Sequence, residues 1–380
     1  MNRLIPLVLV LFALSIASPT RAEINISGFA TLAGGLTFDD DESLQGYDDA
    51  FSFDANSLIA LQASSDIGNG WGVTTQLMTR GSNDWEVDAE WAYVSYDVND
   101  NWRLLLGRQR TPFYLYSDFL DVSYAYHWIT PPTGVYNLPF DSVNGIGSIY
   151  NFTLADFDSS LHILYGRTGQ DLEAGGTSSP SNLEDLFNIA WTLNRDWLTI
   201  RLSYAAATLD VQLDSIVPLQ QGWAQAGFAH IGDRLAISDE SPTFLGLGVI
   251  LDFDDFIIIT EYTEVEVGES IFPDQDSYYV SFGKRFDDML VHLTYGQDED
   301  KAKDLLRGVP VGVDPGLDFL IANTIGAIAS NEQESNYLTL GMRWDVSDSV
   351  AFKVEYTNFE DDLITGNEAS LLQIAITTVF

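Results

Sequence analysis

The sequence predicts an all-β fold, a transmembrane antiparallel β-barrel of about sixteen strands. Apolar residues recur at every second position from Glu23 onward, for example in the segments 198–204 and 350–356, and this period is typical of strands. The strands that this pattern predicts are close to the ten residues that a tilted strand needs to cross a bilayer. Their connections alternate between short and long, which favours a barrel with short periplasmic turns and long extracellular loops.

The first 22 residues form a separate element. A basic start at Met1-Asn2-Arg3 is followed by an apolar run from Leu4 to Ala17, and Ala22 provides a small residue before Glu23. This layout predicts a cleaved secretory signal peptide over 1–22. The alternative is an N-terminal anchor, but the run is too short for a membrane-spanning helix. We expect residues 23–380 to form a single barrel.

Sixteen strands are predicted along the mature chain. They cover 23–36, 54–66, 71–80, 86–98, 102–110, 145–155, 159–168, 186–195, 197–208, 243–253, 256–267, 276–286, 289–297, 336–346, 349–359 and 369–380. Connections after even-numbered strands are tight, such as Asn69-Gly70 and Asp287-Asp288, whereas 111–144, 209–242 and 298–335 are long. A soluble β-sandwich has no reason to keep this alternation over the whole chain. An even strand count places both ends of the barrel on the periplasmic side.

Composition excludes several classes of protein. The formal charge is −39 and there is no cysteine, so we expect neither nucleic-acid binding nor disulfides. Hydrophobic residues make up 46% of the chain, which argues against disorder. Aromatic residues recur at two depths, one near the long loops and one near the tight turns, as expected for rings at the two membrane interfaces.

Several motifs resemble the general Gram-negative porins. They are AEWAYVSY at 89–96, LGRQ at 106–109, TP at 111–112, NGIGSIY at 144–150 and the terminal Phe380. The resemblance implies a sixteen-stranded homotrimeric barrel in the outer membrane that lets small polar solutes and ions diffuse passively. It also implies that 111–144 is a constriction loop folded into the barrel. Phe380 and the last strand would then be the signal for the barrel-assembly machinery.

Strand parity predicts which side chains face the lumen. If the tyrosines near the loop ends face lipid, the residues next to them point into the lumen. A charged side chain costs little free energy there, because the lumen is filled with water. With the acidic residues of the constriction loop, the candidate pore-lining residues are Arg80, Glu90, Asp118, Asp121, Asp141, His162, Arg201, Glu261, His292, Arg343, Lys353 and Glu355. Glu90 stands where the resembled family commonly has a basic residue, so the transverse field is expected to be weaker or to favour cations.

Two basic residues break the parity. Arg108 lies on the face of Leu104 and Leu106, so either a bulge turns it into the pore or it meets a neighbouring subunit. Lys284 shares the face of its neighbouring phenylalanines near a strand end, where its ammonium group can reach the interface.

These features predict an outer-membrane pore that prefers cations, and not an enzyme. The nearest alternative is a channel specific for a sugar or an organic acid, and a third is a plugged, structural barrel. A hydrolase would need a Ser or Asp paired with one of four histidines near the outer rim. We expect no cofactor. The acidic loop runs are either a solvated surface or a place where Ca²⁺ or Mg²⁺ is shared with lipopolysaccharide.

Overall fold

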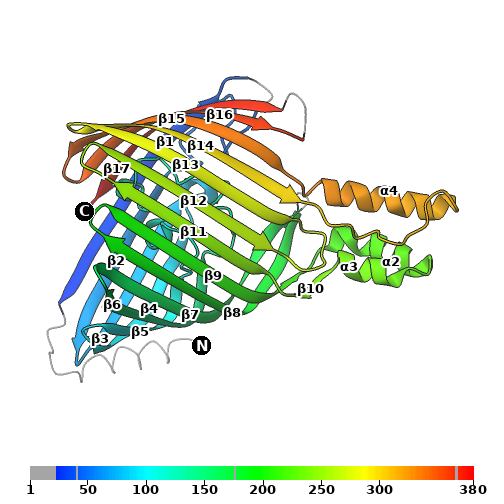
Figure 1. Ribbon diagram of the computed structural model, residues 1–380, viewed down its shortest axis with the longest axis horizontal. Coiled ribbons are helices and arrows are strands. Elements are labelled where there is room, and N and C mark those ends of the chain that lie inside the picture. The colour runs from blue at the N-terminus through cyan, green and yellow to red at the C-terminus, as the bar shows by residue number, and fades with distance from the viewer. Residues whose placement is uncertain (1–22, 40–41, 175–176, 364–366) are drawn as a thin grey trace, which may run out of the picture.

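The computed structural model describes residues 23–39, 42–174, 177–363 and 367–380. The predicted signal peptide therefore lies outside the described residues. Within them, one sheet of antiparallel strands closes on itself (Figure 1). The strands are β1 (Ile24–Thr37), β2 (Leu58–Gly68), β3 (Trp71–Arg80), β4 (Val87–Asn99), β5 (Trp102–Arg110), β6 (Ser142–Leu154), β7 (Phe157–Ala174), β8 (Thr177–Arg195), β9 (Leu198–Val211), β10 (Ile237–Glu240), β11 (Thr243–Asp252), β12 (Phe256–Glu266), β13 (Asp274–Phe286), β14 (Met289–Lys301), β15 (Glu334–Ser347), β16 (Val350–Asp361) and β17 (Glu368–Val379).

Sixteen of these strands form the closed wall, which confirms the predicted barrel. Each pairs with its sequence neighbour, and β1 pairs with β17 from Phe29↔Val379 to Thr37↔Leu371 to close the circle. The short β10 lies outside this series, because β9 pairs directly with β11 and also with β10.

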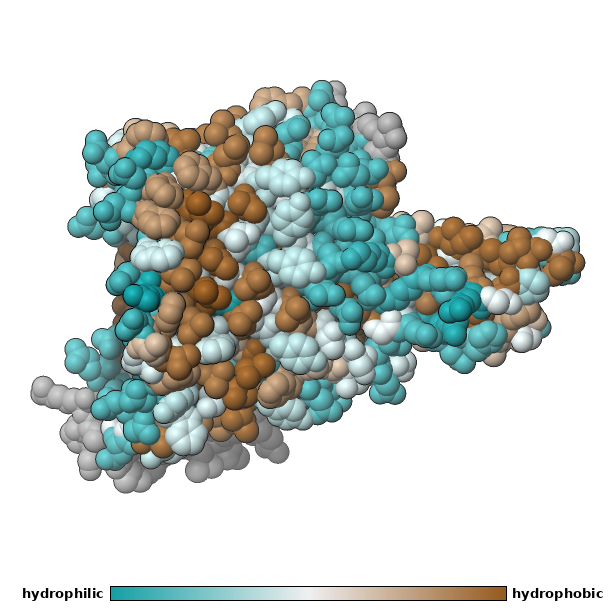
Figure 2. Space-filling model, in the orientation of Figure 1, coloured by the Kyte–Doolittle hydropathy of each residue, from teal (hydrophilic) through white to brown (hydrophobic). Residues whose placement is uncertain are grey.

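The period-two pattern separates the two faces of the wall. Along β16, Ala351, Lys353, Glu355 and Thr357 are buried inside the barrel, whereas Tyr356 is exposed on the outside. The outward tyrosine on β9, Tyr204, is likewise exposed. Figure 2 shows the result as a band of hydrophobic side chains across the visible face of the barrel. Such a band is what lipid contact requires.

Two predicted strand boundaries were wrong. β7 and β8 continue well beyond the predicted 159–168 and 186–195 and pair with each other up to Ala174↔Thr177. The register shifts between Gly166 and Thr168, opposite a stretch of β8 in which Asp185 has φ 50°. A bulge of this kind interrupts the period-two pattern, so the extensions looked like a loop in the sequence.

Two of the long connections between wall strands contain α-helices. They are the 3-10 turn η4 (Asp214–Ile216) with α2 (Val217–Gln225) and α3 (Ala229–Leu235) in one, and α4 (Pro315–Ala329) in the other. These helices project beyond the end of the barrel opposite the C-terminus (Figure 1). Trp223 of α2 is fully buried and donates its indole N–H to Thr324 of α4 at 2.9 Å. None of the helices in the described ranges has the length and hydropathy to span a bilayer.

The last residue completes the seam between β1 and β17. The Phe380 amide donates to the Gly28 carbonyl at 2.9 Å, and the Gly28 amide donates back at 2.8 Å. The Phe380 ring covers Gly28 so closely that a Cβ there would lie 2.6 Å from ring carbons. Only glycine leaves room for the ring.

We expect Gly28→Val to displace the Phe380 ring and weaken the seam by about 1–3 kcal/mol, the usual range for overpacking. The measurement is the temperature at which the folded barrel loses its compact migration in detergent gels. Gly326→Val is the control, because nothing lies within 4 Å of its would-be Cβ. An unchanged transition in Gly28→Val would contradict the proposed role of the ring contact.

Candidate functional site, a loop folded into the barrel

The segment between β5 and β6, residues 111–141 and here called L3, lies inside the barrel. It is slightly shorter than the predicted 111–144, because β6 already begins at Ser142. It contains two 3-10 turns, η2 (Ser117–Phe119) and η3 (Ser123–Ala125). Its large side chains are buried, among them Phe113, Tyr116 and Trp128. The high aromatic content of L3 therefore forms a packed structure rather than a mobile loop.

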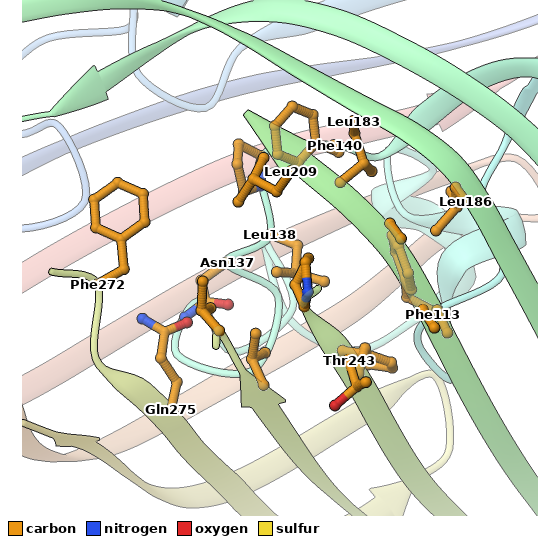
Figure 3. Close-up of a pocket in the computed structure, with 18 of the residues that line it drawn as sticks. Phe113, Asn137, Leu138, Phe140, Leu183, Leu186, Leu209, Thr243, Phe272 and Gln275 are labelled. Carbon is orange, nitrogen blue, oxygen red and sulfur yellow. The ribbon is translucent and has the colours of Figure 1, made fainter. Parts of the chain in front are cut away.

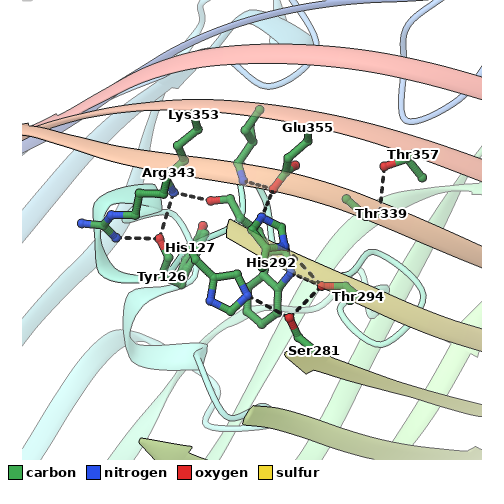
Figure 4. Close-up of polar contacts among 12 residues, drawn as sticks. Tyr126, His127, Ser281, His292, Thr294, Thr339, Arg343, Lys353, Glu355 and Thr357 are labelled. Atoms are coloured by element: carbon green, nitrogen blue, oxygen red, sulfur yellow. Dashed lines mark hydrogen bonds and ion pairs between the residues drawn. The ribbon is translucent and has the colours of Figure 1, made fainter. Parts of the chain in front are cut away.

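A fully buried lysine holds the middle of L3. Lys353 on β16 donates to the Ser123 carbonyl at 2.5 Å, to the Tyr126 carbonyl at 2.9 Å and also to the Trp128 carbonyl (Figure 4). On the neighbouring β15, Arg343 donates to the Tyr126 carbonyl at 2.8 Å. The loop carbonyls thus replace the water that these two cations would otherwise need.

Acidic and neutral groups of the same wall bind the next part of L3. Glu355 accepts the Ile129 amide at 3.0 Å and lies 3.4 Å from His292. Trp128 donates its indole N–H to Thr294 at 2.8 Å. Because β14 and β16 both contribute, the loop is fixed across several strands rather than at one point (Figure 4).

Glu261 on β12 anchors both arms of the loop. Its carboxylate accepts the Leu115 amide at 2.7 Å, the Tyr136 hydroxyl at 2.6 Å and the Tyr279 hydroxyl at 3.2 Å. Leu115 and Tyr136 lie on opposite arms of L3, so a single buried carboxylate holds the two arms together.

The base of L3 rests on a cluster of five charged side chains. Arg80 contacts Glu90 at 2.5 Å and Asp121 at 3.1 Å. Arg110 contacts Glu90 at 3.3 Å, Asp141 at 3.6 Å and also Asp121. Glu90 is the extra residue where the pairing of β3 with β4 shifts between Gln76 and Leu77, and it is buried. Its charge is therefore met by two guanidinium groups.

A separate pair of oppositely charged side chains lies on the β7–β9 side. Arg201 contacts Asp118 of L3 at 3.3 Å, and the half-buried His162 interacts electrostatically with both. Several buried polar atoms on this side have no hydrogen-bond partner among the residues that the structure describes, namely Gln109 Oε1, His162 Nε2, Arg201 Nε and both amide atoms of Asn188. Buried polar groups of this kind are normally satisfied by water.

The comparisons with known proteins agree with this architecture. A family model described as Gram-negative porin matches residues 7–364.

The chain belongs to the Gram-negative porin family.

Solved structures support the fold of this porin. It is similar to the outer membrane channel DcaP of Acinetobacter baumannii, with a TM-score of 0.60, 12% identity and coverage of 96% of this chain and 99% of that one. It is also similar to an anion-selective porin from Comamonas acidovorans, with a TM-score of 0.59, 13% identity and coverage of 95% and 100%. OmpF of Salmonella typhi, in complex with daunomycin, gives a TM-score of 0.59 at 12% identity over 94% and 98%. Among curated protein sequences, none matches significantly. The porin lies in the outer membrane.

The two residues that break parity both face outward in the porin. Arg108 pairs with Ala92 and Asn144 with no shift in register at that point, and the neighbouring Leu106 is exposed on the outside. The bulge reading of Arg108 is therefore wrong. Lys284 contacts Asp255 of a tight turn at 3.3 Å, as expected for a lysine that reaches the interface.

The sequence analysis missed several residues that hold L3. Arg110, Tyr136 and Ser203 were not singled out, although Ser203 donates to the Phe113 carbonyl. The sequence did carry a signal for Arg110. This residue ends the strand with the LGRQ motif, directly before the loop, and the three carboxylates that it contacts were already candidate pore-lining residues. For Tyr136 and Ser203 the sequence offers no comparable signal.

The charge cluster at the base of L3 should resist mild acid. Burial raises the pKa of Asp121, but Arg110 and Arg80 outweigh it and hold the net value below the ordinary one. A lowered pKa in the folded state stabilises the loop above the unfolded value of about 4, and this stabilisation is lost as pH falls through the folded value.

We therefore expect the change in single-channel conductance that Asp121 causes to occur below about pH 4, when its carboxylate takes up a proton. Recordings between pH 7 and pH 2 measure this. Asp121→Asn, which cannot titrate, should lose this acid step and keep any change that other groups cause at higher pH. A step near pH 6 that is present in the wild type and absent from Asp121→Asn would contradict the assignment.

Proposed function

We propose that the porin is a passive diffusion channel for small hydrophilic solutes and ions, with a preference for cations. The observation that carries this proposal is the pairing of the basic groups around L3. Arg80, Arg110 and Arg201 each contact a carboxylate, and Arg343 and Lys353 are engaged by loop carbonyls. The four arginines are therefore largely neutralised, since Arg343 also pairs with Asp345, and the ammonium group of Lys353 is enclosed by the loop. A formal charge of −39 makes the protein as a whole attractive to cations.

The aqueous path is proposed to run between L3 and the β5–β9 wall. The opposite wall, from β12 to β16, is covered by the loop through Glu261, Glu355 and Lys353. Unpartnered buried polar atoms occur on both sides, with those of Gln109, His162 and Asn188 on the β5–β9 side, which these contacts of the loop leave uncovered. Water that satisfies these atoms would form the path.

Reversal potentials in a tenfold gradient of KCl across a planar bilayer test the proposal. We expect a potential of the sign that K⁺ permeation gives, which shrinks as salt screens the surface charge. A potential of the Cl⁻ sign would refute the preference but leave the channel in place. Absence of any conductance would refute the channel and support a plugged barrel.

Catalysis is not part of the proposal. His127 lies 2.9 Å from Ser281, which has the spacing of a base and a nucleophile. Both side chains are buried where L3 packs against the wall, so a substrate has no access to the serine. Hydrolysis of a soluble nitrophenyl ester by the purified porin, lost in Ser281→Ala, would favour the hydrolase instead.

We also propose a homotrimer with Arg108 at the subunit contact. The similar OmpT structure from Vibrio cholerae, with a TM-score of 0.54 and 12% identity, is described as a trimer form. In the present chain Arg108 lies on the outer face of β5, beside the exposed Leu106, where its guanidinium group would contact a neighbouring subunit. Arg108→Leu should then shift the mass of the detergent-solubilised assembly toward the monomer.

The remaining partners are proposals of the same kind. Lipopolysaccharide is expected to contact the outer rim, where Ca²⁺ or Mg²⁺ would be shared between its phosphates and the acidic loops. Chelation of these divalent cations should then lower the thermal stability of the assembly in native membranes. Phe380 is proposed as the signal that the barrel-assembly machinery reads, so removal of Phe380 should slow insertion in cells.

A further inference from the structure

The mouth of the barrel above L3 contains an apolar cavity of about 490 Å³. It lies between the extended ends of β8 and β9, the strands β11 to β13 and the returning arm of L3 (Figure 3). Phe113 and Phe140 of L3, Phe244 of β11 and Phe272 before β13 contribute rings to its lining. A volume of this size is typical of sites for small organic molecules.

The lining carries no charged side chain within the described part of the chain. Its polar side chains are Asn137, Thr243, Gln275 and Asn331. In a protein with 56 acidic residues, this is unusual for a surface that solutes pass. A carboxylate or ammonium group would lose its hydration here without gaining a partner of opposite charge. A bare sugar would leave most of its hydroxyl groups without hydrogen bonds.

A single unpartnered amide lies directly below the cavity. Leu186 of β8 and Ala205 of β9 both line the cavity, and Asn188 is the next inward residue after Leu186 and pairs with Ala205. Asn188 is completely buried, and neither its amide oxygen nor its amide nitrogen finds a partner in the described ranges. An amide offers both a donor and an acceptor to a hydroxyl group.

We propose that this cavity binds a small uncharged amphipathic solute, with its apolar ring among the phenylalanines and its hydroxyl-bearing end toward Asn188. The inference rests on the proposed function, because it places the binding site on the diffusion path just above L3. It narrows the alternative of a specific channel to neutral ring-bearing solutes rather than plain sugars or organic acids.

Uptake of two glucosides into porin-containing liposomes tests the proposal. Phenyl β-D-glucoside has an apolar ring and methyl β-D-glucoside does not, and both are uncharged. We expect uptake of the phenyl compound to saturate with concentration and that of the methyl compound to stay linear. The phenyl compound should also slow entry of the methyl compound, which tests binding in the wild-type protein alone.

Ala205→Phe fills the cavity and should remove both the saturation and the competition. The matched control is Ala322→Phe, because Ala322 is exposed on α4 and does not line the cavity, and it should behave as wild type. Linear phenyl glucoside uptake without competition, together with normal ion conductance, would overturn the cavity site and leave the channel standing. Failure of ions and both glucosides to pass would overturn the channel itself and the site with it.

Discussion

Lys353→Met is expected to release the middle of L3 and raise single-channel conductance. The buried ammonium group donates to three loop carbonyls and to the Ser123 hydroxyl, and its nitrogen lies 5.1 Å from the centre of the Tyr126 ring. Methionine keeps the length of the side chain but donates nothing. Each carbonyl left without a donor costs about 1–3 kcal/mol, so the loop should leave the wall and the folded state should lose stability.

Conductance in planar bilayers and the unfolding transition in urea measure the two effects of Lys353→Met. Lys284→Met is a suitable control, because that lysine is partly exposed at the turn end of β13 and contacts only Asp255 among the charged groups described. Wild-type conductance in Lys353→Met, with a normal unfolding transition, would show that the lysine does not hold the loop.

Arg110→Gln should have the second large effect, on both stability and selectivity. Arg110 is buried against Glu90, Asp121 and Asp141. Without it, Arg80 alone pairs with Glu90 and Asp121, and Asp141 loses its contact with Arg110. Breaking a buried ion pair from one side typically costs about 3–5 kcal/mol, and the uncompensated negative charge should favour cations further.

The reversal potential of Arg110→Gln should therefore move further toward that of an ideal cation-selective membrane. Arg195→Gln is the control, since Arg195 is exposed at a tight turn beside Asp156. A reversal potential that moves toward the Cl⁻ side would contradict the charge balance assigned to this cluster.

Much of the wall could be predicted from the sequence because lipid on one side and water on the other impose a strict period of two. The inward positions of Arg201, Glu261 and Lys353 follow from the outward tyrosines on the same strands, which lie an odd number of residues away. The rule failed where the pairing shifts. Glu90 is the extra residue of a bulge in β4, and the extended ends of β7 and β8 follow a second bulge. A bulge interrupts the period of two on which the prediction relied.

The contacts of L3 could be predicted only in part. Acidic residues of the loop and basic residues of the wall were both recognised, so the pair Arg201–Asp118 joins two candidates. Their pairing partners could not be assigned, because each depends on the path of the loop through the lumen. Backbone carbonyls, which bind Lys353 and Arg343, carry no sequence signal at all. The helices outside the barrel were not predicted. They lie within 209–242 and 298–335, which the sequence indicated only as long connections between strands.

The bonds of Lys353 also bear on the order of assembly. Its partners Ser123 and Tyr126 lie 230 and 227 positions earlier in the chain, so this contact cannot form until nearly all of the polypeptide has been made. Contacts of such long range slow folding. A loop that entered after β17 had joined β1 would have to fold into a barrel that is already closed. Entry before β17 pairs with β1 avoids that obstacle. The last strands would then close the barrel around a loop that is already in place.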